Sequence, residues 1–253
     1  MRGRVSLERH RQDWERLAEV DAMWAVLTAP EQKGGAWDAE RFFATGAAEI
    51  DHVLSVVDSL GRPLARGRAL DFGCGVGRLT RALGVRFERA IGIDISERMV
   101  AQATRLHEAF PASEFRVNAA ADLGQFDTGS FDFVYSSIVL QHLPSHREIE
   151  VYIAEFLRVV RPDGLVVFGI PGRIALPWSL QPRRRLYALL RRLGVSEEWM
   201  LRRTPLTPMR MTVVPEAAVR RMLAERDATL LHVEQVDDGP VRTLTYFVAP
   251  AGG

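Results

Sequence analysis

The most informative stretch of this 253-residue sequence reads Arg68-Ala-Leu-Asp-Phe-Gly-Cys-Gly-Val-Gly-Arg-Leu-Thr-Arg-Ala82. It predicts a short apolar strand, then a turn that contains Gly73, Gly75 and Gly77, and then the start of a helix. Glycines in such a turn permit sharp backbone torsions and let a ligand approach backbone that a Cβ atom would obstruct. We therefore expect a ligand to bind close to the backbone of this loop.

Downstream of the glycine loop, short apolar runs alternate with amphipathic stretches. This alternation is typical of parallel strands joined by crossover helices, so it predicts an α/β sheet. The first five predicted strands cover residues 68–71, 90–94, 114–118, 131–137 and 165–170.

Two helices between these strands have clear start signals. Ser96 is expected to cap a helix that runs through Ala109. A capping box of Ser145 and Glu148 opens the second helix. The sequence Arg-Pro-Asp-Gly at 161–164 is expected to end that helix and to turn into the next strand.

The C-terminal part of the chain has a different pattern. Residues 230–236 and 241–248 read as strands, and they flank Asp237-Asp-Gly-Pro240, a turn short enough for a hairpin. The last strand should therefore be antiparallel. Pro215 opens a helix ahead of this hairpin, at a position where its missing N–H costs little.

Acidic and basic residues near the glycine loop narrow the choice of ligand. Arg78 stands where a dinucleotide-binding fingerprint has its third glycine, which disfavours an NAD site. Asp94 closes the second predicted strand, at about the twenty-residue offset expected for a carboxylate that binds a ribose. An ionised carboxylate can accept hydrogen bonds from both ribose hydroxyls.

The segment Asp71-Phe-Gly-Cys-Gly-Val-Gly77 resembles the first motif of the class I S-adenosylmethionine-dependent methyltransferases, an acidic residue followed by G-x-G-x-G. The resemblance implies that Asp71 helps to hold the methionine ammonium group, and that Gly73 and Gly75 border the amino-acid moiety. A carboxylate suits this cofactor because S-adenosylmethionine carries an ammonium and a sulfonium but no phosphate.

The resemblance covers residues 68–170 and extends to the fold. It implies a Rossmann-like, doubly wound α/β sheet of seven strands with an antiparallel last strand. Residues 1–60 would form an N-terminal helical cover and residues 61–253 the methyltransferase core. Within that core, residues 171–212 would be an insertion after the fifth strand that serves as a substrate-binding lid.

The same resemblance assigns roles along the cofactor. Asp94 would bind the ribose, and Ile95 would lie against the adenine. The family often has an aspartate near the adenine amino group, but Ala119 occupies that slot here, which leaves Asn118, Asp122 or backbone groups to contact the adenine. The predicted cofactor residues are Asp71, Gly73, Cys74, Gly75, Gly77, Asp94, Ile95, Met99, Asp122 and Ser136.

One histidine is placed to act on an acceptor. His142 follows the fourth predicted strand, which abuts the sulfonium in similar enzymes, and its ordinary pKa suits proton removal. The alternative is a structural histidine bonded to backbone. The predicted surface histidines are His52, His107, His146 and His232.

Aromatic residues outside the motifs are candidates for substrate contact. Trp37 and Phe43 belong to the predicted cover, for which plain packing against the sheet edge is the alternative. Trp178 lies in the predicted lid together with arginine clusters at 183–185, 191–192 and 202–203. Such a lid could hold an acidic or aromatic acceptor, although charge runs are more often solvated helix faces.

Composition sets the remaining limits. Cys74 is the sole cysteine, which excludes an intrachain disulfide and a cysteine-rich zinc site, and we expect no metal. The net charge of +1 gives no long-range attraction to nucleic acid or an anionic membrane. The first residues lack the apolar core of a signal peptide, and no apolar run approaches transmembrane length, so a cytoplasmic location is expected.

The sequence therefore favours a methyltransferase that uses S-adenosylmethionine and a small-molecule acceptor, with oxygen preferred over nitrogen or carbon as the methylated atom. Ser136-Ser-Ile-Val139 differs from the Asp/Asn-Pro-Pro-Tyr/Phe element of enzymes that methylate base amines. The paired glutamates typical of arginine methyltransferases do not occur between Tyr135 and His142. A methyltransferase-like protein that binds without turnover and an NAD-dependent oxidoreductase are the alternatives. Oligomeric state is left open.

Overall fold

The computed structural model describes residues 2–252 and contains one mixed sheet in the order β3-β2-β1-β4-β5-β7-β6. Five neighbouring strands are parallel, and β7 runs antiparallel to both β5 and β6. The strands are β1 (Arg68–Phe72), β2 (Arg89–Asp94), β3 (Ser113–Val117), β4 (Phe131–Ser136), β5 (Val160–Ile174), β6 (Thr229–Asp238) and β7 (Val241–Ala249). The predicted seven-stranded sheet with an antiparallel last strand is confirmed.

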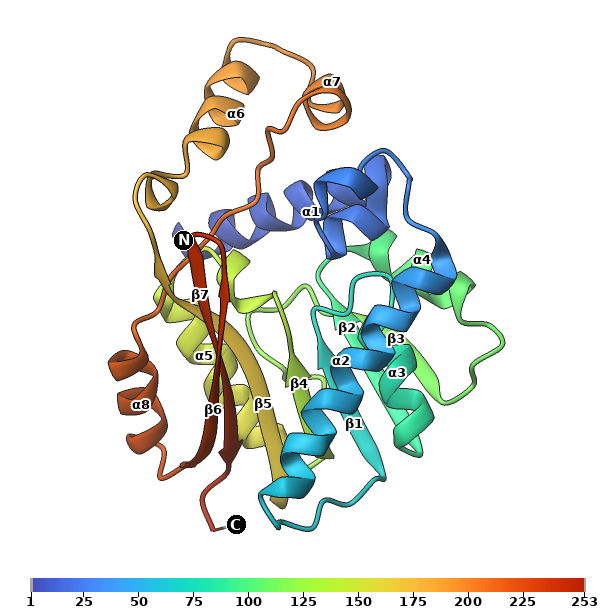
Figure 1. Ribbon diagram of the computed structural model, residues 1–253, viewed down its shortest axis with the longest axis vertical. Helices are drawn as coiled ribbons and strands as arrows, with labels where there is room; N and C mark the ends of the chain where they lie inside the picture. The colour runs from blue at the N-terminus through green and yellow to red at the C-terminus, as the bar shows by residue number, and fades with distance from the viewer. Residues whose placement is uncertain (1, 253) are drawn as a thin grey trace.

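Helices pack on both faces of this sheet and over one of its ends (Figure 1). The α-helices are α1 (Arg2–Val26), α2 (Ala39–Ser59), α3 (Arg78–Arg86), α4 (Glu97–Leu106), α5 (His146–Val159), α6 (Pro182–Arg192), α7 (Glu197–Arg203) and α8 (Glu216–Ala224). Three short 3-10 helices are η1 (Pro30–Gln32), η2 (Leu140–His142) and η3 (Trp178–Leu180). No helix within residues 2–252 has the length and apolar character needed to span a membrane.

Two hydrophobic clusters form the core on either side of the sheet. Successive strand residues point to opposite faces, so Ala69, Phe133 and Val167 pack with α2 and α3, while their neighbours Leu70 and Val134 pack with α5. Burying an aliphatic or aromatic side chain contributes about 1.5–3 kcal/mol. The central strands are buried on both faces, which is why they read as continuous apolar runs in the sequence.

A third cluster joins segments that are far apart in the sequence. It contains Leu17 and Ala18 of α1, Phe42 and Phe43 of α2, and residues of α6 and α7 such as Tyr187 and Met200. The first helix and the segment that contains α6 and α7 therefore pack together above the end of the sheet (Figure 1).

Helix starts match the predictions better than helix ends do. Ser96 accepts a hydrogen bond from the Met99 N–H, and Ser145 accepts one from the Glu148 N–H, as a capping residue should. The predicted end of α4 is wrong, because the helix stops at Leu106 rather than Ala109. The ring of His107 turns inward and its Nδ1 donates to the Ala103 carbonyl at 2.7 Å.

The same region corrects a second prediction. His107 is buried, not at the surface, and its ring packs against Phe43, Phe110 and Phe115. Phe43 belongs to α2 and Phe115 to β3, and Phe110 lies in the loop that follows His107. The helical pattern around position 107 does not indicate the contacts with α2 and β3.

The fifth strand is longer than predicted at both ends. Residues 161–164 do not form a separate turn but lie within β5, which begins at Val160 paired with Phe131 and has an irregular register before Leu165. Its far end continues through Pro171 to Ile174 because these residues pair with residues 241–243 of β7. The predicted insertion therefore begins inside the strand rather than after it.

Candidate functional site

A cavity lies at the carboxyl ends of β1, β2 and β4. The glycine loop after β1 forms its floor, with Gly73 and Gly75 among the lining residues. Helix α1 covers it with His10, Trp14 and Val26. The carboxyl ends of parallel strands, where the strand order reverses, are the common position of ligand sites in such sheets.

The glycine loop adopts backbone torsions that require glycine. Gly73 and Gly75 have φ of 76° and 52°, values that a residue with a side chain rarely adopts. The N–H groups of Gly73 and Cys74 both donate to the Ile93 carbonyl, at 2.8 and 2.9 Å, which ties the loop to the end of β2. A Cβ on Gly75 would collide with Val26 of α1, so the cover reaches down to the loop backbone.

Asp94 joins the loop to the next strand. Its carboxylate accepts from the Gly75 N–H at 2.9 Å and from the Ser96 N–H at 2.9 Å, and it lines the cavity. Burial raises the pKa of Asp94 to about 6, although the backbone N–H groups oppose this shift. A bound polyhydroxyl group would supply further donors to the remaining lone pairs.

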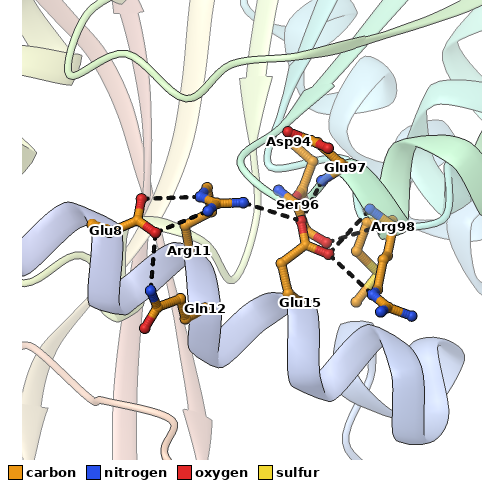
Figure 2. A network of polar contacts seen from close by, with 9 residues as sticks. Glu8, Arg11, Gln12, Glu15, Asp94, Ser96, Glu97 and Arg98 are labelled. Atoms are coloured by element: carbon orange, nitrogen blue, oxygen red, sulfur yellow. Dashed lines mark hydrogen bonds and ion pairs between the residues drawn. The ribbon is translucent and has the colours of Figure 1, made fainter.

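Glu15 of α1 binds the N-terminus of α4 next to Asp94 (Figure 2). The Glu15 carboxylate accepts from the backbone N–H of Glu97 at 2.6 Å and of Arg98 at 3.3 Å, at the N-terminus of α4. It also lies 3.6 Å from the Arg98 guanidinium and 3.9 Å from that of Arg11. The cover is thus attached by an acid at a helix N-terminus, where negative charge is favoured.

Arg78 anchors the other side of the loop. Its side chain is 3% exposed, pairs with Glu49 at 2.8 Å and lines the cavity. The Tyr135 hydroxyl donates to the second Glu49 oxygen at 2.8 Å. This network links α2, α3 and β4. In the sequence, Arg78 was noted only because it stands where a dinucleotide-binding motif has a glycine. Its pairing could not be predicted, because Glu49 and Thr45 lie 29 and 33 residues away in the chain.

A second, larger cavity adjoins the first. It lies between the end of α1, the loops around α6 and α7, and the segment 204–211. Both cavities share Ala25, Val26, Ile138 and His142 as lining residues. Ile138 has φ of 62°, a strained conformation for a β-branched residue, and it sits at this boundary.

Comparison with known proteins identifies the core. Residues 70–168 match the family model described as a methyltransferase domain. The ubiquinone biosynthesis O-methyltransferase of Xanthomonas oryzae pv. oryzae is 30% identical over 173 residues, which are 68% of this chain and 65% of that protein. Residues 70–168 therefore form a methyltransferase domain, and over this region the chain resembles the class I methyltransferases.

Other relatives agree with this assignment. The trans-aconitate 2-methyltransferase of Deinococcus radiodurans is 35% identical over 113 residues, 44% of this chain and 40% of that protein. These alignments span less than two thirds of either relative. The magnesium protoporphyrin IX methyltransferase of Synechocystis PCC 6803, solved with bound S-adenosylhomocysteine, has the same fold, with a TM-score of 0.61 at 20% identity over 96% of this chain and 99% of that one.

Class I methyltransferases use S-adenosylmethionine, and the first cavity has a donor set that fits this cofactor. It offers a carboxylate, open glycine backbone and apolar walls. Of the predicted cofactor residues, those that line it are Gly73, Cys74, Gly75, Asp94, Ile95 and Met99.

Four other predicted cofactor residues lie outside the lining. Asp71 is 1% exposed beneath the loop and accepts from the Thr80 hydroxyl at 2.6 Å. Gly77 is the N-cap of α3 with φ of 84°, and a Cβ at this position would collide with Phe115 and His107. Ser136 is buried and donates to the Phe72 carbonyl at 3.3 Å, and Asp122 is exposed.

Among the adenine candidates, Asn118 lines the cavity and Asp122 does not. The Asn118 amide donates to the Asp122 carbonyl at 3.1 Å and accepts from Gln125 at 3.0 Å. Asp122 thus contributes backbone that orients Asn118, while its carboxylate faces solvent.

The predicted substrate residues separate into two groups. Trp178 lines the second cavity, together with Trp24. Trp37 and Phe43 line neither cavity: Trp37 donates to the Leu27 carbonyl at 3.1 Å, and Phe43 packs against Phe42 and His107. Both therefore hold the cover together from outside the site.

His142 lines both cavities. Its Nδ1 donates to the Arg210 carbonyl at 2.6 Å, which fixes the tautomer and leaves Nε2 as an acceptor that the Gln141 amide contacts at 3.4 Å. Burial lowers the pKa of His142 to about 4, so the ring is neutral at pH 7. The backbone bond predicted by the structural alternative is therefore present, and the position expected of a base is present as well.

Proposed function

We propose that this protein transfers the methyl group of S-adenosylmethionine to an oxygen atom of a small molecule. The observation that carries the proposal is the junction of two cavities at Ile138 and His142, one suited to the cofactor and one open to an acceptor. Oxygen as the methylated atom is supported by the relative named as a ubiquinone biosynthesis O-methyltransferase.

Each part of the cofactor has a residue of matching chemistry in this proposal. Asp94 accepts from the ribose hydroxyls, Asn118 and Ile95 contact the adenine, and Gly73 and Gly75 border the methionine. Asp71 lies beneath the loop, where its charge acts on the ammonium group through the loop rather than by direct contact. Burial raises the pKa of Asp71 to about 7, and a nearby ammonium would favour its ionised form.

The bound cofactor supplies an electrophilic methyl group, and the protein must align the acceptor with it and exclude water. Helix α1 provides the exclusion, since Trp14 and Val26 close the cavity from above. The boundary at Ile138 and His142 positions the acceptor atom. For a hydroxyl acceptor, the Nε2 lone pair of neutral His142 takes up the proton, whereas an ionised oxygen needs no base.

Binding of the cofactor is tested first. Isothermal titration should detect S-adenosylmethionine and S-adenosylhomocysteine but neither NAD nor NADP. Preference for a dinucleotide would overturn the cofactor assignment. Failure of every ligand to bind would favour the methyltransferase-like binding protein that the sequence left open.

Methyl transfer is tested with S-adenosylmethionine that carries a carbon-13 methyl group. The protein is incubated with a metabolite extract, and products are examined by NMR, because methyl groups on oxygen, nitrogen and carbon have distinct carbon chemical shifts. A labelled methoxy or methyl ester signal that requires the protein is expected. A labelled N-methyl or C-methyl product would keep the methyltransferase and replace the oxygen acceptor.

A further inference from the structure

The second cavity is strongly basic. Its lining contains the six cationic residues Lys33, Arg183, Arg184, Arg202, Arg203 and Arg210, and no aspartate or glutamate appears among the described lining residues. The whole chain carries a net charge of only +1, so this concentration of positive charge is local.

Two of these cations already have partners. Arg202 pairs with Glu198 at 3.0 Å. The ammonium of Lys33 donates to the Thr204 carbonyl and lies over the Trp24 ring. Arg202 is therefore paired with a carboxylate, whereas Lys33 keeps its charge but has its ammonium held by a carbonyl and a ring.

The other four form no ion pair with any residue in the described part of the chain: Arg183, Arg184, Arg203 and Arg210. Arg183 lies over the Trp178 ring at 5.5 Å, and Arg210 donates to the Pro144 carbonyl at 2.9 Å. A guanidinium that is partly desolvated without a carboxylate is costly, and an anion that meets it in bidentate geometry removes that cost.

Arg184 and Arg210 give the strongest indication of an anion-binding site. The Nε of Arg184 is buried and lacks a hydrogen-bond acceptor within residues 2–252. Burial, followed by the positive charge of Arg210, lowers the pKa of Arg184, so the two cations repel each other. The Asp13 carboxylate opposes this shift in part and lines the adjoining space, but it is already paired with Arg191 at 3.4 Å.

The position of this pair relates it to the methyl-transfer site. Arg184 and Arg210 line the second cavity and also the adjoining space bounded by His10, Trp14 and His142. The Arg210 carbonyl accepts the bond that fixes the His142 ring. Neither arginine lines the cofactor cavity.

Given the proposed function, on which this assignment rests, we infer that the acceptor carries a carboxylate or phosphoryl group that is held by Arg184 and Arg210. The anion fills the space between the two guanidinium groups and removes their repulsion. The rest of the acceptor then lies along Trp24 and Trp178 and reaches the boundary at Ile138, where the cofactor methyl group would be presented.

The test compares four compounds that share one aromatic ring: benzoate, phenyl phosphate, benzyl alcohol and benzylamine. Their affinities are measured by isothermal titration on the full chain saturated with S-adenosylhomocysteine. Benzoate or phenyl phosphate should bind at least about tenfold more tightly than the alcohol and the amine. The stronger of the two anions distinguishes a carboxylate site from a phosphoryl site, and inorganic phosphate alone measures the contribution of the anion.

Three variants locate the anion. Arg184→Gln and Arg210→Gln should each weaken binding of the preferred anion by about tenfold to a hundredfold, the loss expected for a charge-assisted hydrogen bond. Arg185→Gln is the matched control, because Arg185 is exposed on the same helix and does not line the cavity. All three should bind S-adenosylhomocysteine like the unmodified protein, which also shows that they fold.

Equal affinity for charged and neutral compounds, no binding of any of them, or unchanged anion binding in both variants would overturn the inference. The inference would also be overturned if the protein bound a single-stranded oligonucleotide but none of the small anions. These outcomes are distinguishable from failure of the proposed function, in which S-adenosylhomocysteine itself would not bind.

Discussion

The Asp94 carboxylate accepts two backbone hydrogen bonds and still faces the cofactor cavity. Replacing it by alanine removes the acceptor for the ribose hydroxyls and frees the Gly75 N–H. We expect Asp94→Ala to weaken S-adenosylhomocysteine binding by at least about tenfold, as loss of hydrogen bonds to a charged group should. Isothermal titration measures this change.

Asp122→Ala is the matched control for that experiment. Asp122 was also predicted to bind the cofactor, but its carboxylate is exposed and outside the cavity lining. Its removal should leave affinity within about twofold. Equal losses in the two variants would show that Asp122 reaches the cofactor, and unchanged affinity in Asp94→Ala would remove Asp94 from the site.

His142 gives the protein a specific pH dependence. Its folded-state pKa of about 4 lies below the ordinary value of 6.5, so the unfolded chain binds the proton more readily. Above pH 6.5 the ring is neutral in both the folded and the unfolded chain, and its full contribution to the free energy of unfolding is present. This contribution is lost as the pH falls from 6.5 toward 4. The full shift corresponds to roughly 3 kcal/mol.

His142→Asn should reduce this loss, because the amide can still donate to the Arg210 carbonyl but cannot be protonated. Urea denaturation at pH 7 and pH 5 measures the difference, and His146→Asn, at an exposed histidine of α5, is the control. Comparison within the series is required because burial raises the pKa of Asp71 and Asp94 and acts in the opposite direction. An unchanged pH slope in His142→Asn would contradict a neutral buried ring.

The site residues that could be predicted are those whose defining features lie close to them in the sequence. The glycine loop and Asp94 were identifiable because a short motif and a fixed offset specify them. The Arg78–Glu49–Tyr135 network, the strained Ile138 and the cover residue His10 were not, since their surroundings come from distant segments. Asp71 was identified as a motif residue, but its burial beneath the loop follows only from the packing of Thr80.

For single helices and strands, the first residues of α4 and α5 were predictable from the sequence, whereas the end of α4 and the length of β5 were not. The capping serines at 96 and 145 act within four residues, so the sequence contains the whole signal. The end of α4 depends on where the His107 ring packs, and the length of β5 depends on pairing with β7. Tertiary contacts of this kind override local turn signals such as Arg-Pro-Asp-Gly.

The attachment of α1 to α4 through Glu15 gives a prediction about the cover (Figure 2). Glu15→Ala removes an acid that caps α4 from another helix, an interaction of about 1 kcal/mol. The cover should open more often, so S-adenosylhomocysteine should dissociate about fivefold faster. Stopped-flow displacement measures the rate.

Glu19→Ala provides the control on the same helix, because Glu19 pairs only with Arg16 of α1 among the described ion pairs. Its exposed pair should contribute little, and dissociation should be unchanged. Equal acceleration by both variants would mean that α1 helicity, and not its attachment to α4, controls release.

At the scale of the whole molecule, helix α1 packs directly against the segment that contains α6 and α7. Leu17 of α1 shares a buried cluster with Tyr187 of α6 and Met200 of α7. The Arg191 guanidinium adds an ion pair with Asp13 at 3.4 Å, and Lys33 contacts the Thr204 carbonyl. The second cavity lies between these parts, so we expect any movement of α1 to change this cavity as well.

Cofactor binding should therefore slow hydrogen exchange in α6 and α7 as well as in α1, although neither α6 nor α7 lines the cofactor cavity. At a concentration about a hundred times its Kd, a ligand that binds only the native state stabilises it by about 2.7 kcal/mol, enough to slow exchange through coupled openings by up to about a hundredfold. Helix α8, which lines neither cavity, serves as the internal reference. Protection of α1 without α6 and α7 would show that the lid moves independently, and the acceptor could then enter while the cofactor remains enclosed.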